Sequence, residues 1–241
     1  MRDSENLYDK IRELIGNVPG SFNILEEEIN VDLQVEYFEL SKRMAEEYNA
    51  DWALDQIDLL EDPDYPPESK KQLLARLATL EDVSAYRAIE GFARFADEEL
   101  RDWSMLALQE SRMHLESNLL GENQVFISTG LGGRDHKLRY FVALISRNEE
   151  ILNPFQVKII GDEFPFALSR YQGEVEEYQA EGYLATFLLL LPIQYSVKEV
   201  FSEAIKECNQ YGDFLRDNCI VTNVKKLTFN EIIDFIERRS E

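Results

Sequence analysis

Basic residues are scarce in this chain of 241 residues. Only 25 Lys and Arg stand against 47 Asp and Glu, which gives a formal net charge of −22. Phosphate binding needs clustered Lys and Arg, and a strongly negative protein repels a polyanion. The shortage of positive charge therefore argues against a nucleic-acid partner and favours a partner with a basic surface.

Cysteine and histidine are scarcer still, because Cys208, Cys219, His114 and His136 are the only residues of these types. They lack the spacing of a zinc site, and two reduced thiols are favoured over a single disulfide. We therefore predict no metal and no cofactor.

Long apolar runs and a secretory signal are absent. The longest apolar run extends from Leu184 to Ile193, with only Thr186 interrupting it, whereas a membrane span needs about 20 residues. The N-terminal sequence shows no apolar stretch after a basic start. We therefore expect no membrane association and a cytoplasmic location.

What the chain does have is an apolar content of 44%, which excludes a disordered chain. Its charge is uneven: residues 1–122 hold 12 basic and 29 acidic residues, a net charge of −17, whereas residues 123–241 hold 13 and 18, a net charge of −5. We predict two domains with this boundary, an acidic all-helical domain over 1–122 and an α/β domain over 123–241.

Apolar spacing in the first half is helical. Ala85, Ile89, Phe92 and Ala96 recur on one helix face, and Asp97 has the position of an N-cap for the next helix. Further helices are expected over residues 3–16, 31–49, 53–60 and 67–80, with a break at 18–20, while residues 22–31 give no clear pattern.

One part of this half resembles a known family. The run from Ala88 to Leu108 has an apolar first helix, an acidic turn at 97–99, and a second helix that opens Leu100-Arg101 and continues with Ser104 and Ala107-Leu108. This run is similar to a HEAT-type helical repeat, with a weaker copy over residues 53–80. On the second helix Leu100, Ser104, Ala107 and Leu108 share one stripe. The resemblance implies that Arg101 turns inward and pairs with an acid such as Asp97 or one in the preceding repeat.

The second half reads as strands and helices in the order ββαβαβα. Strands are predicted over residues 124–129, 138–146, 183–193 and 219–224. Helices are predicted from Pro154 to about Gly182 with an interruption at Pro165, over 197–211, and after Thr228. The predicted fold class is therefore α+β in two parts, a HEAT-like helical region followed by a compact α/β layer domain.

A glycine-rich segment, Gly130 to Asp135, joins the first two of these strands. A phosphate-binding loop would lead into a helix, but the residues that follow read as a strand, so a hairpin connection is favoured. The alternative is an anion site formed by Arg134, His136 and Arg139, with Asp135 beside them. Residues 174–177, with three glutamates, are read as a helix face, and Glu26-Glu27-Glu28 as a solvated run.

Two classes of function stay open. No assembled catalytic motif is visible, so we favour a non-enzymatic module whose acidic helical surface binds a basic or amphipathic protein, for example an inhibitor or immunity-type protein. The candidate interaction residues are Glu98, Glu99, Trp52 and Trp103, although packing is favoured over binding for both tryptophans. The alternative is a ligand-binding or enzymatic α/β domain with the anion site, and a protein that mimics DNA would share the charge. Partner identity and oligomeric state stay undetermined.

Overall fold

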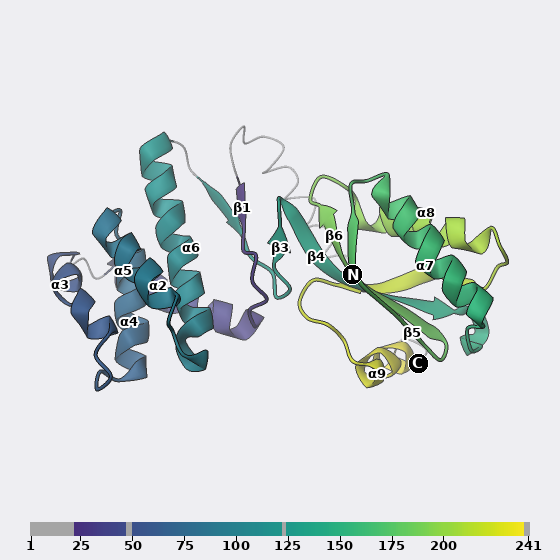
Figure 1. Ribbon diagram of the computed structural model, residues 1–241, viewed down its shortest axis with the longest axis horizontal. Helices are drawn as coiled ribbons and strands as arrows, with labels where there is room; N and C mark the ends of the chain where they lie inside the picture. Colours follow the sequence, from purple (N-terminus) through teal and green to yellow (C-terminus); the bar gives the residue numbers. More distant parts are fainter. Residues whose placement is uncertain (1–21, 47–49, 122–123, 239–241) are drawn as a thin grey trace. The chain divides into compact units, whose positions relative to one another are not determined.

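The structure, a computed structural model, describes residues 22–46, 50–121 and 124–238, and its chain divides into two units (Figure 1). The helical unit comprises residues 22–25 and 29–127 of the described chain, and the sheet unit comprises residues 26–28 and 128–238. The predicted boundary at 122 lies close to this division. The helix predicted over residues 3–16 and the break at 18–20 lie outside the described residues.

The helical unit contains five described helices that pack around one core. Their order, with two short strands and a 3-10 turn, is β1 (Phe22–Ile24), α2 (Val31–Glu46), α3 (Ala50–Asp55), η1 (Ile57–Leu60), α4 (Pro67–Ala78), α5 (Val83–Ala93), α6 (Glu98–Leu120) and β2 (Val125–Ile127). The two helices of the better HEAT-like copy begin at aspartate caps. The Asp82 carboxylate accepts from the amides of residues 84 and 85, and the Asp97 carboxylate accepts from that of Leu100.

Two strands complete this unit, and one of them departs from the prediction. β1 and β2 form a parallel pair in which Phe22 lies opposite Val125. The strand predicted over 124–129 therefore exists, but it pairs with β1 in the helical unit and not with the sheet that follows. The pairing joins segments about 100 residues apart, and such long-range partners leave no local sequence signal.

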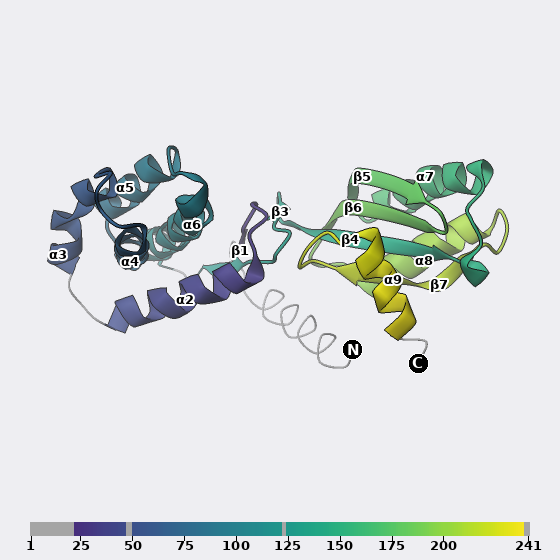
Figure 2. The ribbon, with the colours of Figure 1, turned by 90° about the horizontal axis from the view of Figure 1, so that it is seen from below.

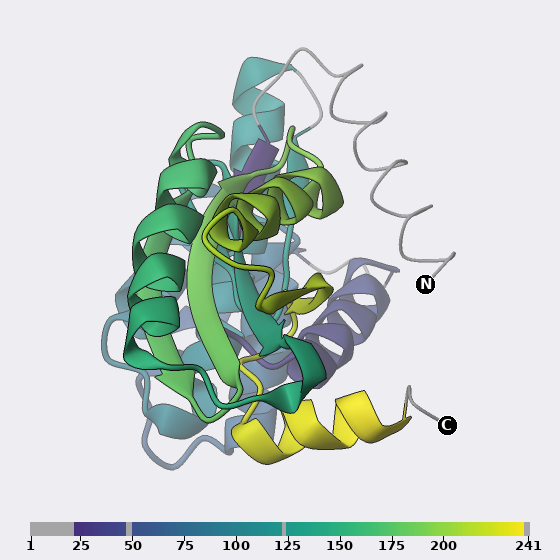
Figure 3. The ribbon, with the colours of Figure 1, turned by 90° about the vertical axis from the view of Figure 1, so that its right-hand side faces the viewer.

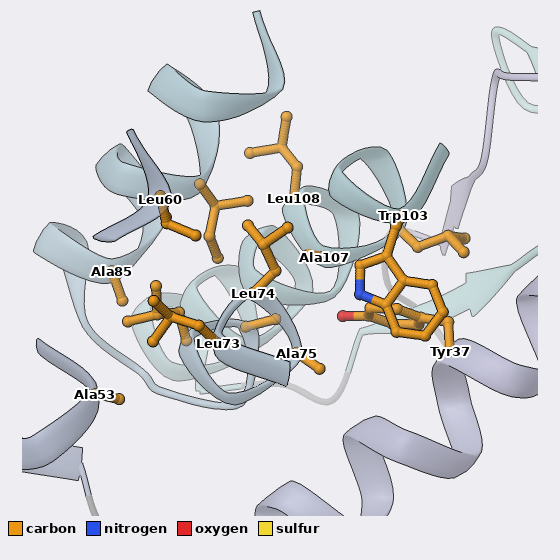
Figure 4. Close-up of a cluster of buried hydrophobic side chains, with 14 of the residues drawn as sticks. Tyr37, Ala53, Leu60, Leu73, Leu74, Ala75, Ala85, Trp103, Ala107 and Leu108 are labelled. Atoms are coloured by element: carbon orange, nitrogen blue, oxygen red, sulfur yellow. The ribbon is translucent and has the colours of Figure 1, made fainter. Parts of the chain in front are cut away.

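The core of the helical unit lies between α2, α4, α5 and α6 (Figure 4). Trp103 is 1% exposed, its indole nitrogen donates to the Lys71 carbonyl at 3.0 Å, and its ring lies edge-to-face with Tyr37. Leu100, Ala107 and Leu108 are buried, in agreement with their shared position on one helix stripe. These contacts fix α6 against α2 and α4.

Arg101 departs from the role that the resemblance implied. Its side chain is exposed and forms no ion pair with any residue that the structure describes, and Asp97 instead caps the helix through Leu100. The expected inward pairing of Arg101 is therefore wrong. The Arg101 guanidinium is hydrated at this exposed position. Turning it inward would remove it from water and would cost free energy that no acidic partner offsets. The HEAT resemblance itself stays a prediction.

The sheet unit alternates strands and helices. Its elements are β3 (Gly133–Arg134), β4 (Lys137–Ser146), η2 (Arg147–Glu149), α7 (Pro154–Ser169), β5 (Glu174–Glu181), β6 (Leu184–Pro192), α8 (Val197–Asn209), β7 (Leu215–Thr222) and α9 (Phe229–Arg238). The strand order is β7-β4-β6-β5, every neighbour is antiparallel, and β3 also pairs with β4. This is the ferredoxin-like arrangement of two interleaved split βαβ units, so the α+β class is confirmed.

Helices cover both faces of this sheet (Figures 2 and 3). On one face Phe164 of α7 stacks on Phe187 of β6 at 4.5 Å, and Phe201 of α8 lies against Tyr140. On the opposite face Phe141, Ala143 and Ile145 of β4 pack with residues of α9, whose buried members are Ile232 and Ile236. Because both faces are covered, β4 and β6 are almost continuously apolar, which confirms the buried strand predicted over 183–193.

The segment after Pro154 differs most from its prediction. α7 runs through Pro165 without a break, since Phe164 and Leu168 on either side of it are buried against the sheet. The helix ends at Ser169, and residues 174–181 form the strand β5. The glutamates at 174, 176 and 177 therefore lie on a strand, and the predicted helix face is wrong.

Candidate functional site

The glycine-rich segment forms part of a hairpin, as predicted, but the turn itself lies after the glycines. β3 and β4 are joined by Asp135 and His136, whose φ angles are +49° and +64°, so the turn has the two left-handed residues of a type I′ hairpin. Gly132, with φ +66°, lies against residues 26–28, and a Cβ there would come within 2.4 Å of the Glu27 carbonyl. The glycine is thus needed for close packing of the backbone.

The basic residues of this hairpin lie in an ion-pair network with the glutamates of β5. Arg139 donates twice to Glu176, at 2.5 and 3.1 Å, and once to the Leu131 carbonyl at 2.7 Å. Arg134 contacts Glu174 at 3.1 Å, and Lys137 also pairs with Glu174. Hydrogen bonds from Lys137 and Arg139 hold the pKa values of Glu174 and Glu176 below their usual range.

The predicted anion site is therefore only partly assembled. Arg134, Asp135 and Arg139 lie at one end of the sheet, with His136 in the same turn, but both guanidiniums already pair with carboxylates. The strand that supplies these carboxylates, residues 174–181, has only a short alternation at Tyr178 and Ala180, because a bulge between Val175 and Glu177 interrupts the period of 2. Anion binding here stays a prediction.

A second cluster surrounds Lys71 in the helical unit. The Lys71 ammonium donates to Glu68 at 2.7 Å, and this hydrogen bond, with attraction from Glu36 and Glu99, raises the pKa of Lys71. These three glutamates come from α4, α2 and α6, and we call them the Lys71 acidic cluster. Glu98, a predicted interaction residue, is exposed beside Glu99.

The two tryptophans have different roles. Trp52 is 44% exposed on α3, and the Arg76 guanidinium lies 5.6 Å from its ring centre. Trp103 is buried in the core, where its ring fills the space between α2, α4 and α6, so the favoured packing role is confirmed and its candidacy as a surface interaction residue is wrong. Trp52 has the exposure that a binding residue needs.

Ion pairing differs between the two units. The described part of the helical unit holds 9 Lys and Arg against 20 Asp and Glu, a net charge of −11, and only Glu68 and Glu90 pair with Lys or Arg among these residues. The described part of the sheet unit holds 12 Lys and Arg against 20 Asp and Glu, a net charge of −8. Eight of its basic side chains form ion pairs with other described residues: Arg134, Lys137, Arg139, Arg147, Arg170, Arg216, Lys225 and Lys226.

Glu26–Glu28 group with the sheet unit, which accounts for its change from −5 to −8. The same three glutamates account for half of the difference between −17 and −11 in the helical part, and the other half belongs to residues 1–21, 47 and 122, outside the described chain. What distinguishes the helical unit is the number of carboxylates without a basic partner.

A third cluster joins α2 to α6 around Glu110, and the sequence patterns gave no sign of it. The Tyr37 hydroxyl donates to this carboxylate at 2.5 Å, Ser41 donates at 2.6 Å, and His114 lies 3.8 Å away. Burial raises the pKa of Tyr37, and the contact with Glu110 raises that of His114. Because both hydroxyls are donors to one carboxylate, the arrangement cross-links two helices.

Other predicted features can be placed. Cys208 and Cys219 are free thiols, as predicted, and burial raises the pKa of each to about 12. No three potential ligands among His, Cys, Asp and Glu come together for a metal ion in the described chain. Across the same residues, no helix combines the length and the apolar character needed to cross a membrane.

Comparison with known proteins gives little. No family model matches the chain, and no curated protein matches it. A solved structure of a protein from Deinococcus radiodurans R1, named a "putative transposase", shares 16% identity with a TM-score of 0.37, and the match covers 44% of this chain and 94% of that one. A similarity this low supports no inference about function.

Proposed function

We propose that the helical unit is a non-enzymatic interaction module that binds a basic or amphipathic protein through the Lys71 acidic cluster and Glu98. The observation that supports the proposal most is the excess of carboxylates without basic partners on this unit. A protein that neutralises a basic toxin or nuclease would have this character. A cytoplasmic location is part of the proposal and agrees with two free thiols.

Electrostatics and apolar contact would contribute differently. Unpaired surface carboxylates attract a basic partner over distances of about 10 Å and speed its association, and salt weakens this effect. Exposed apolar side chains next to the acidic ones supply the contact area that charge alone does not provide. Val35, beside Glu36, is 52% exposed, and Phe95, shortly before Glu98, is 89% exposed.

The test uses two triple variants with the same change of charge. The first replaces Glu36, Glu98 and Glu99 by glutamine on the helical unit. The matched control replaces Glu150, Glu199 and Glu237 of the sheet unit, all exposed and without an ion-pair partner among the described residues. Immobilised wild type and both variants are used to capture proteins from native lysate at low and high salt, with far-ultraviolet circular dichroism as the check on the folding of both units.

The proposal expects a basic protein that wild type and the control capture at low salt and that the first variant loses. High salt should reduce the capture by wild type. If the first variant retains the same proteins, or if wild type captures none at either ionic strength, the proposal fails.

A further inference from the structure

We propose that a cleft in the sheet unit binds a small ligand that has an apolar body and a cationic amino group. The cleft lies between the edge strand β5, its neighbour β6 and the start of α9, and its volume is about 230 Å³. This is just below the range of roughly 300–1,000 Å³ that is usual for ligand pockets, so the ligand must be small. All residues that line the cleft belong to the sheet unit.

The floor of the cleft is apolar. Leu184 and Leu188 of β6, Phe141 of β4 and Ile232 of α9 line it, and all four are buried. Phe229 at the start of α9 lines it as well and lies edge-to-face with Tyr183. An apolar floor of this kind favours a hydrocarbon or aromatic body over a fully polar ligand.

Three polar side chains around this floor have no partner among the described residues. Gln179 and Glu181 lie two residues apart on β5, so they share the sheet face that carries the cleft, and Thr186 of β6 is paired directly opposite Gln179. Each keeps its hydrogen-bonding capacity for a ligand. A few convergent polar groups beside an apolar wall are what a small-molecule site requires.

The net charge of the side chains at the rim of the cleft determines which charge a ligand can carry. Lys226 forms an ion pair with Glu177 at 2.6 Å, which leaves the Glu181 carboxylate uncompensated and the rim with one negative charge. An ammonium group near Glu181 would gain a charge-assisted hydrogen bond, whereas a carboxylate would be repelled. Amines are therefore preferred over acids of the same shape.

The experiment titrates the full chain with three probes of similar shape, phenethylamine, 2-phenylethanol and 3-phenylpropionate, and follows amide chemical shifts by NMR. We expect phenethylamine to shift amides of β5, β6 and the start of α9, with an affinity at least tenfold above that of 3-phenylpropionate. Glu181→Gln should reduce phenethylamine affinity about tenfold, because a neutral amide replaces the carboxylate that accepts the charge-assisted hydrogen bond. Glu199→Gln, on α8 across the sheet, should leave it unchanged.

Three results would overturn the assignment. The first is the absence of localised shifts with any probe, the second is equal affinity for the amine and the acid, and the third is an equal loss of affinity in Glu181→Gln and Glu199→Gln. The failure of this site would leave the proposed interaction surface untouched, because none of its residues belongs to the helical unit.

Discussion

The hydrogen bond between Tyr37 and Glu110 is the contact whose loss should weaken the helical unit most clearly. Tyr37→Phe removes a donor 2.5 Å from a carboxylate whose side chain is only 11% exposed, and keeps the ring that packs on Trp103. Hydrogen bonds to charged groups contribute about 1.5–3 kcal/mol. Because Ser41 still donates to Glu110, we expect the lower part of this range, about 1.5–2 kcal/mol of unfolding free energy.

A matched control exists in the same unit. The Tyr86 hydroxyl lies 3.5 Å from Glu90, at the limit of a hydrogen bond, and Glu90 already pairs with Arg87. Tyr86→Phe should therefore change the unfolding free energy by less than about 0.5 kcal/mol. The two variants lose the same atom, so they differ only in the contact that is removed.

Tryptophan fluorescence during urea unfolding is the assay, because the chain has two tryptophans and both lie in the helical unit. The signal therefore reports on this unit alone, even if the two units unfold separately. A loss below 0.5 kcal/mol for Tyr37→Phe, or equal losses for both variants, would refute the role given to Glu110.

Three further predictions concern the positive φ angles of Gln172 and Gly132 and the titration of His114. Gln172 has φ +57° after α7, so Gln172→Gly should stabilise the sheet unit by about 0.5–1 kcal/mol, measured by hydrogen exchange of β6 amides. Gly132→Ala should destabilise it by more than about 1 kcal/mol, with faster exchange in β4, because its Cβ would clash with the Glu27 carbonyl. The folded pKa of His114 is raised, chiefly by its interaction with the Glu110 carboxylate, so its stabilisation should be complete below pH about 6.5 and lost as pH rises through the folded value. Urea titrations of wild type and His114→Gln should differ most at pH below 6.5 and converge at higher pH.

Local patterns predicted most elements of this fold. The cap at Asp97, the buried run of β6 and the stripe of α8 each follow from residues within one element. The strand β5 is not predicted, because the sequence from Pro154 to about Gly182 is interpreted as helix with an interruption at Pro165, and the three glutamates of residues 174–177 as a face of that helix. Its alternation extends only from Tyr178, which packs on Phe187, because the bulge between Val175 and Glu177 breaks the period of 2 before it.

The candidate site was less accessible to sequence reasoning. The sequence identifies Arg139 as a candidate site residue. Its partner Glu176, however, lies 37 residues away, on a strand that is not the direct neighbour of β4. The same holds for Tyr37 and Glu110, which are 73 residues apart. Contacts of this range depend on how helices and strands are arranged, which spacing within one segment does not specify.

The central claim, that the helical unit binds basic partners through its acidic face, is tested most directly by NMR titration of the full chain with a basic amphipathic Lys/Leu peptide. The account predicts chemical-shift changes concentrated at the Lys71 acidic cluster and Glu98, with an affinity that falls as salt rises and is lost in the triple glutamine variant. Equal shifts over both units, or an affinity that does not change in that variant, would contradict it.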